Sequence, residues 1–357
     1  MRPRWSHAPR SALTRRSLLR LGALVAVAPA LTACAGAQAE RAVERYLNGQ
    51  DLVTSFSTDA RPNWGKTPVV RAHATLRDGA AVDEVLALCL SAQEELSSVF
   101  GEIDLSLAWA FADGGRCEVT DLEMGKGREL KTEELLRECL ECTQYAATTL
   151  RRTAVCHRPS PVGSSLTVDW GQVDAVPADV LMTTPAQLAP SALDLAFTQT
   201  MVLGGWPVLV SPIVGESMES APLAEIVGVL GERPDDPGTL ATASPSDENR
   251  SSVRVEWSAP SGLHQVTADM TISVRYNDGM DPGPLSGSGS TFDDRAAEVI
   301  RVVDRSRWRH LLSLAHDGAQ AYHSTSIDAS VRPLRPDPEM TDAEDLSMAE
   351  RLLDAAS

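Results

Sequence analysis

Residues 69–96, VVRAHATLRDGAAVDEVLALCLSAQEEL, decide the predicted fold because they change from one periodicity to another. From Val70 to Leu76, apolar residues occupy every second position, which is the period of a half-buried strand. Asp78-Gly79 then interrupts the chain. From Val82 to Leu96 the apolar residues recur at the spacing of an amphipathic helix. The stretch therefore predicts a strand, a turn and a helix that covers the strand.

The following hundred or so residues continue in the same manner. The patterns predict strands at 103–109, 116–122 and 165–170 and a helix at 133–150. The order βαββαβ is typical of a ferredoxin-like antiparallel sheet with both helices on one face. We therefore predict an α+β fold whose first domain spans residues 67–172.

A similar β-α-β-β-α order recurs later in the chain, after strand 266–276 and its Asp278-Gly279 turn. This recurrence predicts a second, related α+β domain over residues 173–357. Within it, the apolar spacing predicts a helix at 191–203. The polar stretch near 231–252 is expected to be a mobile loop.

The charge of the chain separates its first 33 residues from the rest. The formal net charge is −17, but residues 1–33 carry six Arg and no acidic residue. The remaining 324 residues have 26 basic and 49 acidic groups, which gives −23. Such an acidic body repels phosphate, so we expect no nucleic-acid partner.

Residues 1–33 have the three parts of a cleaved export signal, namely an Arg-rich start, an apolar run and small residues. The apolar run, Leu21 to Leu31, is about half of the roughly 20 residues that a membrane-spanning helix needs. The following segment, 34–66, has few apolar periods, and we interpret it as a tether that contains at most a short helix.

Two motifs in the signal resemble known export signals. Thr14 to Arg20, with Arg15 and Arg16, resembles the twin-arginine motif, although general secretory signals also carry arginine pairs. Leu31-Thr32-Ala33-Cys34 resembles the lipobox of bacterial lipoproteins, here of the actinobacterial type. This resemblance implies acylation of Cys34 and a palmitate-type anchor that holds the protein at the outer side of the cell membrane.

The five other cysteines all lie in the first predicted domain. Two antiparallel helices would place Cys89 near Cys139, and Cys117 would lie near Cys156. We therefore hypothesise these two disulfides, with Cys142 free, whereas buried reduced thiols are the alternative. The Cys139-Leu140-Glu141-Cys142 spacing lies in mid-helix, where a redox or metal function is not expected.

The sequence predicts no catalytic, cofactor-binding or metal-binding residues. His316, Asp317 and His323 could supply metal ligands, but a hairpin flanked by solvated histidines is the preferred interpretation. The expected function is that of a non-enzymatic binding or scaffold lipoprotein of the cell envelope, whose partner is an envelope protein or a small ligand. The alternatives are an envelope hydrolase that uses carboxylates and a solute-binding lipoprotein of a transporter.

Overall fold

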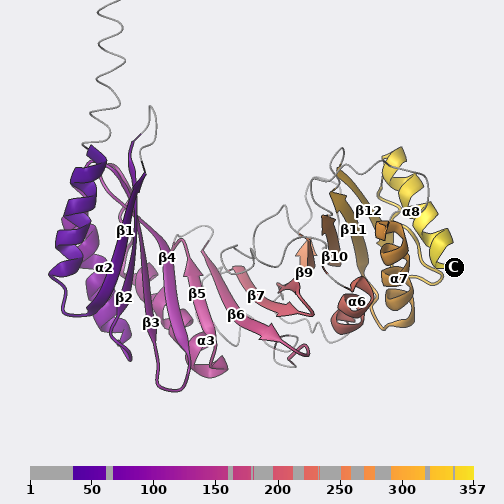
Figure 1. Ribbon diagram of the computed structural model, residues 1–357, viewed down its shortest axis with the longest axis horizontal. Helices are drawn as coiled ribbons and strands as arrows, with labels where there is room; N and C mark the ends of the chain where they lie inside the picture. Colours follow the sequence, from indigo (N-terminus) through magenta and orange to yellow (C-terminus); the bar gives the residue numbers. More distant parts are fainter. Residues whose placement is uncertain are drawn as a thin grey trace, which may run out of the picture. The chain divides into compact units, whose positions relative to one another are not determined.

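The computed structural model of the 357-residue chain describes residues 35–61, 67–159, 164–177, 180, 196–211, 221–231, 233, 251–258, 269–277, 291–317, 322–340 and 342–357. The protein is a mixed α+β protein (Figure 1). The described residues form thirteen strands that follow one another in sequence order in a mixed sheet. The strands are β1 (Val53–Arg61), β2 (Val69–Leu76), β3 (Glu102–Ala110), β4 (Arg116–Met124), β5 (Thr153–His157), β6 (Ser165–Val173), β7 (Ala196–Leu203), β8 (Trp206–Val210), β9 (Ser252–Ser258), β10 (Asp269–Asn277), β11 (Leu311–Asp317), β12 (Tyr322–Asp328) and β13 (Arg335–Pro336). The helices are one over residues 35–48, α2 (Val82–Leu96), α3 (Glu133–Leu150), α6 (Leu223–Leu230), α7 (Thr291–Arg305) and α8 (Ala343–Ala356).

One local plan recurs along the chain: two antiparallel strands, a helix, and then the next two strands. The pairs β1–β2, β7–β8, β9–β10 and β11–β12 are antiparallel. Where α2, α6 or α7 intervenes, the two flanking strands pair directly with each other in parallel. A parallel pair needs such a crossover because the chain must return to the same end of the sheet.

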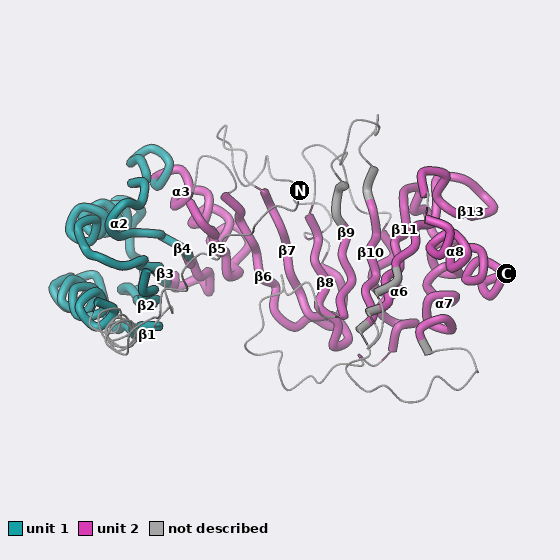
Figure 2. The backbone as a smooth tube through the Cα atoms, turned by 90° about the horizontal axis from the view of Figure 1, so that it is seen from above, with its two compact units in different colours: residues 1–109, 119–136 teal, residues 110–118, 137–357 magenta. Residues whose placement is uncertain are grey.

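The chain divides into two compact units, which Figure 2 shows in different colours. Unit 1 comprises residues 1–109 and 119–136, and unit 2 comprises residues 110–118 and 137–357. The predicted domain boundary at 172/173 does not coincide with this division. It falls inside β6, before its last residue Val173, and β6 and β7 form a parallel pair within unit 2.

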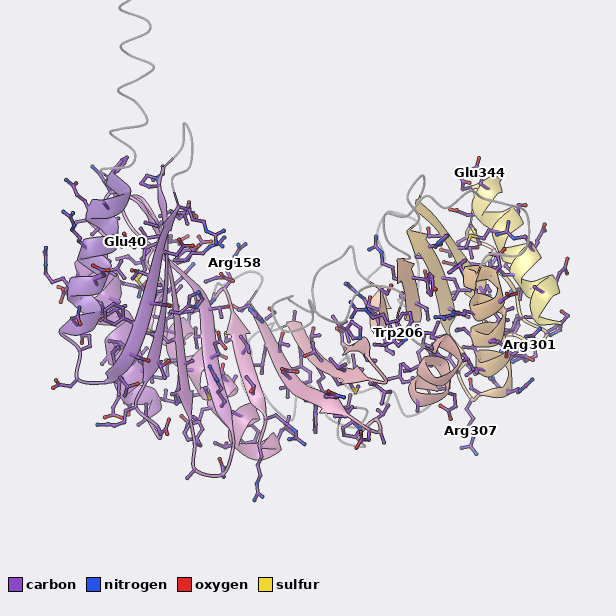
Figure 3. The ribbon with its side chains drawn as sticks, in the orientation of Figure 1. Glu40, Arg158, Trp206, Arg301, Arg307 and Glu344 are labelled. Carbon is purple, nitrogen blue, oxygen red and sulfur yellow. The ribbon has the colours of Figure 1, made fainter. Side chains whose placement is uncertain are left out.

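In unit 2 the described helices pack on one face of the sheet. Thr325 on β12 donates a hydrogen bond to the Asp345 carbonyl oxygen of α8 at 2.7 Å. Phe292 of α7 stacks on His316 of β11. Trp206 of β8, labelled in Figure 3, donates from Nε1 to the Gly231 carbonyl oxygen at the end of α6. These residues lie on the same face of the sheet as the buried core. Trp206 is itself 0% exposed, and Thr325 pairs with the core residue Leu314.

The α+β class is confirmed, but the ferredoxin-like closure is not. That closure needs strand 69–76 to pair antiparallel with strands 116–124 and 165–173. Instead, β2 pairs in parallel with β3, from Val69 opposite Glu102 to Thr75 opposite Ala108. The physical reason is that a βαβ crossover can place its second strand next to the first or one strand away. Both arrangements have the same element order in the sequence.

Residues 35–61 belong to unit 1 rather than to a tether. Ala39 and Val43 of the 35–48 helix are completely buried, and β1 pairs along its length with β2. Thr58 of β1 contacts this helix, since its hydroxyl donates to Glu40 and Glu44. Glu40 is labelled on the helix in Figure 3. Few apolar residues suffice here because Ala39, Val43, Tyr46 and Leu47 are all buried.

The helix predicted at 191–203 is wrong for residues 196–203, which form β7. Phe197, Gln199, Met201 and Leu203 are buried at every second position. They pair with β6 on one side and β8 on the other. The neighbouring strands therefore decide this element, and a mixture of apolar and hydroxyl residues accommodates either local structure.

Candidate functional site

The residues of the predicted export signal and anchor, Arg15, Arg16, Leu31, Ala33 and Cys34, all lie outside the described residues. The part of the chain that the structure does describe contains no helix long and apolar enough to cross a membrane. The interpretation of the signal and the lipid anchor therefore stays a prediction from the sequence.

The remaining five cysteines are buried and carry free thiols in the structure. Burial raises the pKa of Cys89 and of Cys117 to about 12, so both behave as small apolar side chains at neutral pH. The pairings of Cys89 with Cys139 and of Cys117 with Cys156 stay predictions. The structure places Cys139 in hydrogen-bonding contact with Cys156 and with Ser164.

The histidines predicted to flank a hairpin, His316 and His323, lie on β11 and β12, whose antiparallel register pairs them. His316 is only partly exposed. The His316 ring is stacked on Phe292, with 4.7 Å between ring centroids and 9° between ring planes. Among the described residues, no group of three or more His, Cys, Asp and Glu side chains could hold a metal ion.

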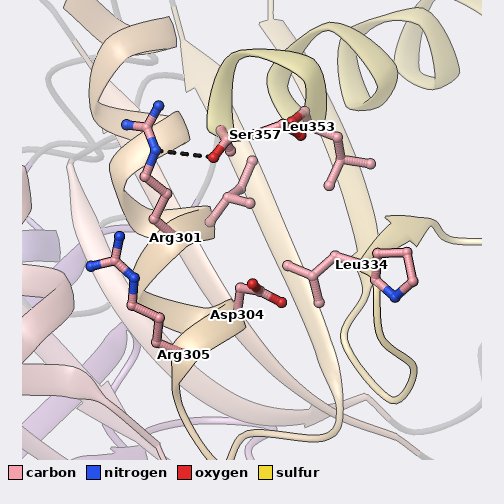
Figure 4. A pocket seen from close by; sticks show the side chains of 9 residues that line it. Arg301, Asp304, Arg305, Leu334, Leu353 and Ser357 are labelled. Atoms are coloured by element: carbon pink, nitrogen blue, oxygen red, sulfur yellow. Dashed lines mark hydrogen bonds between the residues drawn. The ribbon is translucent and has the colours of Figure 1, made fainter.

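A pocket of about 350 Å³ lies between α7, α8 and the segment that contains Pro333 and Leu334 (Figure 4). Arg301 lines it and donates from Nε to the Ala356 carbonyl oxygen at 3.0 Å and from Nη2 to the Ala355 carbonyl oxygen at 2.6 Å. These carbonyls belong to the last turn of α8, which has no further helical donors. Arg301 therefore holds α8 against α7. Among the described residues that line the pocket, no nucleophile lies next to a base.

The carboxylate in this pocket is also engaged. Asp304 lies 3.0 Å from Nε of Arg332. The guanidinium of Arg332 in addition donates to the carbonyl oxygens of Val303, Trp308 and Ala329. Arg332 thus caps the end of α7 in the way that Arg301 caps α8. The pocket therefore lies at the interface of α7 and α8, and an arginine side chain caps the end of each helix.

A second group of carboxylates lies in unit 1 on β3 and β4. Burial raises the pKa of Asp104, and the nearby Glu102, Asp121 and Glu123 raise it further, while Arg71 opposes them. Arg128 forms salt bridges with both Glu102 and Glu123. These carboxylates alternate with buried residues along β3 and β4, so they share one face of the sheet.

The face of the unit 2 sheet opposite the helices carries a continuous row of mostly polar side chains. We call this surface the open face, and its central row lies in register across eight strands. Asp169 is exposed and five members are partly exposed, but Thr200 and Leu209 at the centre of the row are buried, at 5% and 9% exposed. The core residues that alternate with them, such as Val208 and Ile272, are 0% exposed. The row consists of Thr153, Asp169, Thr200, Leu209, Arg254, Ser273, Ser313 and Ser326.

The open face is held by hydrogen bonds between its own side chains. Thr200 Oγ1 donates to Asp169 Oδ1 at 3.3 Å, and the hydroxyls of Thr198 and Ser211 lie 3.1 Å apart. The sequence alone does not reveal this surface, because its residues come from eight strands that only the pairing register aligns. Its side chains make it an extended, hydroxyl-rich sheet face.

A scan against protein families found no family that matches the chain, and searches of curated proteins and of solved structures found no match either. The class that the fold defines is a mixed α+β protein.

Proposed function

We propose that this protein is a bacterial lipoprotein, anchored through Cys34 at the outer side of the cell membrane. It acts there as a non-enzymatic binding or scaffold protein. The observation that carries the binding function is the open face, on which the partly exposed Ser273, Ser313 and Ser326 lie in register while the described helices pack on the opposite face. The lipobox-like sequence that ends at Cys34 supports the anchor.

The partner that this surface suits best is another envelope protein. Ser, Thr and charged side chains on a flat sheet offer many directional hydrogen bonds but little enclosed apolar volume. Small-molecule sites are usually concave and mostly apolar. A protein partner can instead contact several strands at once, as standard interfaces of about 1,600 Å² do.

The anchor is tested by acylation and by membrane fractionation. Cells that produce the full chain should incorporate labelled palmitate, and the Cys34→Ala variant should lose the label and be released from the membrane. Because the body has a charge of −23, it should not remain bound to anionic lipid by charge. Label that persists in Cys34→Ala would contradict the anchor.

The binding surface is tested by site-specific photocrosslinking on intact cells. A photoreactive amino acid replaces Ser313 or Ser326, which are neighbours on the open face, and the matched control replaces Asp354, which is exposed on α8. Both positions on the open face should capture the same protein, and Asp354 should not. Equal capture from all three positions, or from none, would contradict the proposal.

A further inference from the structure

We infer that Cys139 and Cys156 form a disulfide that joins α3 to β5, a pairing that differs from the one expected from helix geometry. Cys139 lies on the sheet-facing side of α3, and Cys156 lies on the core side of β5. Each is 1% exposed, and their side chains are hydrogen bonded to each other. This inference concerns unit 2 alone and does not depend on the anchor.

The surroundings of the two thiols favour this pair over the other cysteines. Thr143 lies one helical turn after Cys139, donates to the Cys139 carbonyl oxygen at 2.6 Å and hydrogen bonds the Cys156 thiol. The Cys139 thiol has a second partner in Ser164. These contacts hold the two sulfur atoms toward each other, as formation of a disulfide requires.

The two thiols also differ in reactivity. The hydrogen bond from Cys156 lowers the pKa of Cys139, and the same hydrogen bond raises the pKa of Cys156 well above its usual range. Cys139 is therefore the thiolate that attacks first, since the thiolate is the nucleophilic form. Cys142 lies near Cys156 and is the competing third thiol.

Formation of this disulfide needs a disulfide oxidant that accepts two electrons. The oxidant is either a thiol–disulfide oxidoreductase of the envelope or a small disulfide such as oxidised glutathione. The Cys139 thiolate attacks one sulfur of the oxidant and expels the other as a thiolate. The Cys156 thiolate then attacks the Cys139 sulfur and expels the second oxidant thiolate. The protein loses two electrons and two protons, and the oxidant is reduced to two thiols. Because both cysteines are buried, this happens while the chain folds or when α3 opens.

The test maps the disulfides of the full chain with Cys34→Ala, after it has refolded in a buffer of oxidised and reduced glutathione. We expect the number of free thiols to fall from five to three and one cross-linked peptide pair to contain Cys139 and Cys156. Five free thiols, or linkage of Cys139 to Cys89 or Cys142, would overturn the inference. This mapping does not involve membranes or a partner, so its result is distinguishable from failure of the proposed function.

A second measurement compares the thermal unfolding of one chain in its oxidised and reduced states, so its main result does not require a variant. The oxidised chain should unfold roughly 5 °C above the same chain after reduction, because the disulfide closes a loop of about 18 residues. Cys142→Ser should retain this difference, whereas Cys156→Ser should abolish it. No difference in Tm between the oxidised and the reduced chain, or loss of the difference in Cys142→Ser, would overturn the pairing.

Discussion

Tyr46 provides a sharp test of whether the 35–48 helix is an integral part of unit 1. Its hydroxyl donates to the Leu88 carbonyl oxygen of α2 at 2.8 Å and lies 2.6 Å from Ser91 Oγ. Tyr46 is only 4% exposed. Its ring and its hydroxyl group thus connect the helix to α2, and the two contributions can be removed separately.

The expected losses of stability follow from these contacts. Tyr46→Phe keeps the ring and removes both hydrogen bonds, which should lower the free energy of unfolding by about 1–2 kcal/mol. Tyr46→Ala also removes the buried ring and leaves a cavity, so the loss should be about 3–5 kcal/mol. A tether would show neither loss, because its side chains would be solvated in the folded protein.

The pH dependence adds an independent measure. Burial raises the pKa of Tyr46 to about 12, with a smaller opposing effect from the Ser91 hydrogen bond. The ordinary pKa of the unfolded state is about 10. The neutral phenol therefore stabilises the folded state fully below pH 10, and this contribution, about 2 kcal/mol, is lost as the pH rises to 12. The stability of the wild type should approach that of Tyr46→Phe over this range.

Urea unfolding of the purified full chain at pH 8, 10, 11 and 12 measures these effects, and amide exchange of residues 35–61 shows whether the segment is protected. The reasoning would be refuted if both variants stayed within 0.5 kcal/mol of the wild type. It would also be refuted if the difference between wild type and Tyr46→Phe did not change above pH 10.

Three further substitutions in unit 2 test contacts that hold its helices and the end of β12. Arg332→Lys should destabilise by about 2 kcal/mol, because a single ammonium cannot contact the several carbonyls that the guanidinium reaches, and urea unfolding measures this. Trp206→Phe should cost about 1 kcal/mol in the same assay through loss of the bond to Gly231. The pKa of Asp328 is lowered because the hydrogen bonds from Ser330 and the ion pair with Arg335 outweigh burial. The wild type should therefore lose stability as the pH falls below about 4, and Asp328→Asn should lose less.

Much of the secondary structure could be predicted from the sequence because its signals are local. β2 and α2 lie where the alternation of residues 69–76 and the helical spacing of residues 82–96 place them. α3 lies at Glu133–Leu150, where the predicted helix at 133–150 places it. In these segments the side-chain periodicity and the final burial agree, so tertiary contacts strengthen the local preference.

Other elements could not be predicted because their burial depends on neighbours distant in the sequence. Residues 53–61 contain no apolar run, yet they form β1 because β2 supplies an edge to pair with. Residues 196–203 became a strand between β6 and β8 rather than a helix. Strand pairing satisfies backbone groups whatever the side chains are, so it can override a weak local pattern.

The sequence by itself determined the α+β class, the acidic charge of the body and the prediction of an exported, acylated chain, because these depend on composition and on short motifs. Only the tertiary structure decided which strands pair and, with that, the open face and the thiol pair. A βαβ order leaves the position of the second strand undetermined. The register that places Ser313 beside Ser326, and the packing that brings Cys139 to Cys156, arise from contacts between elements that are separate in the chain.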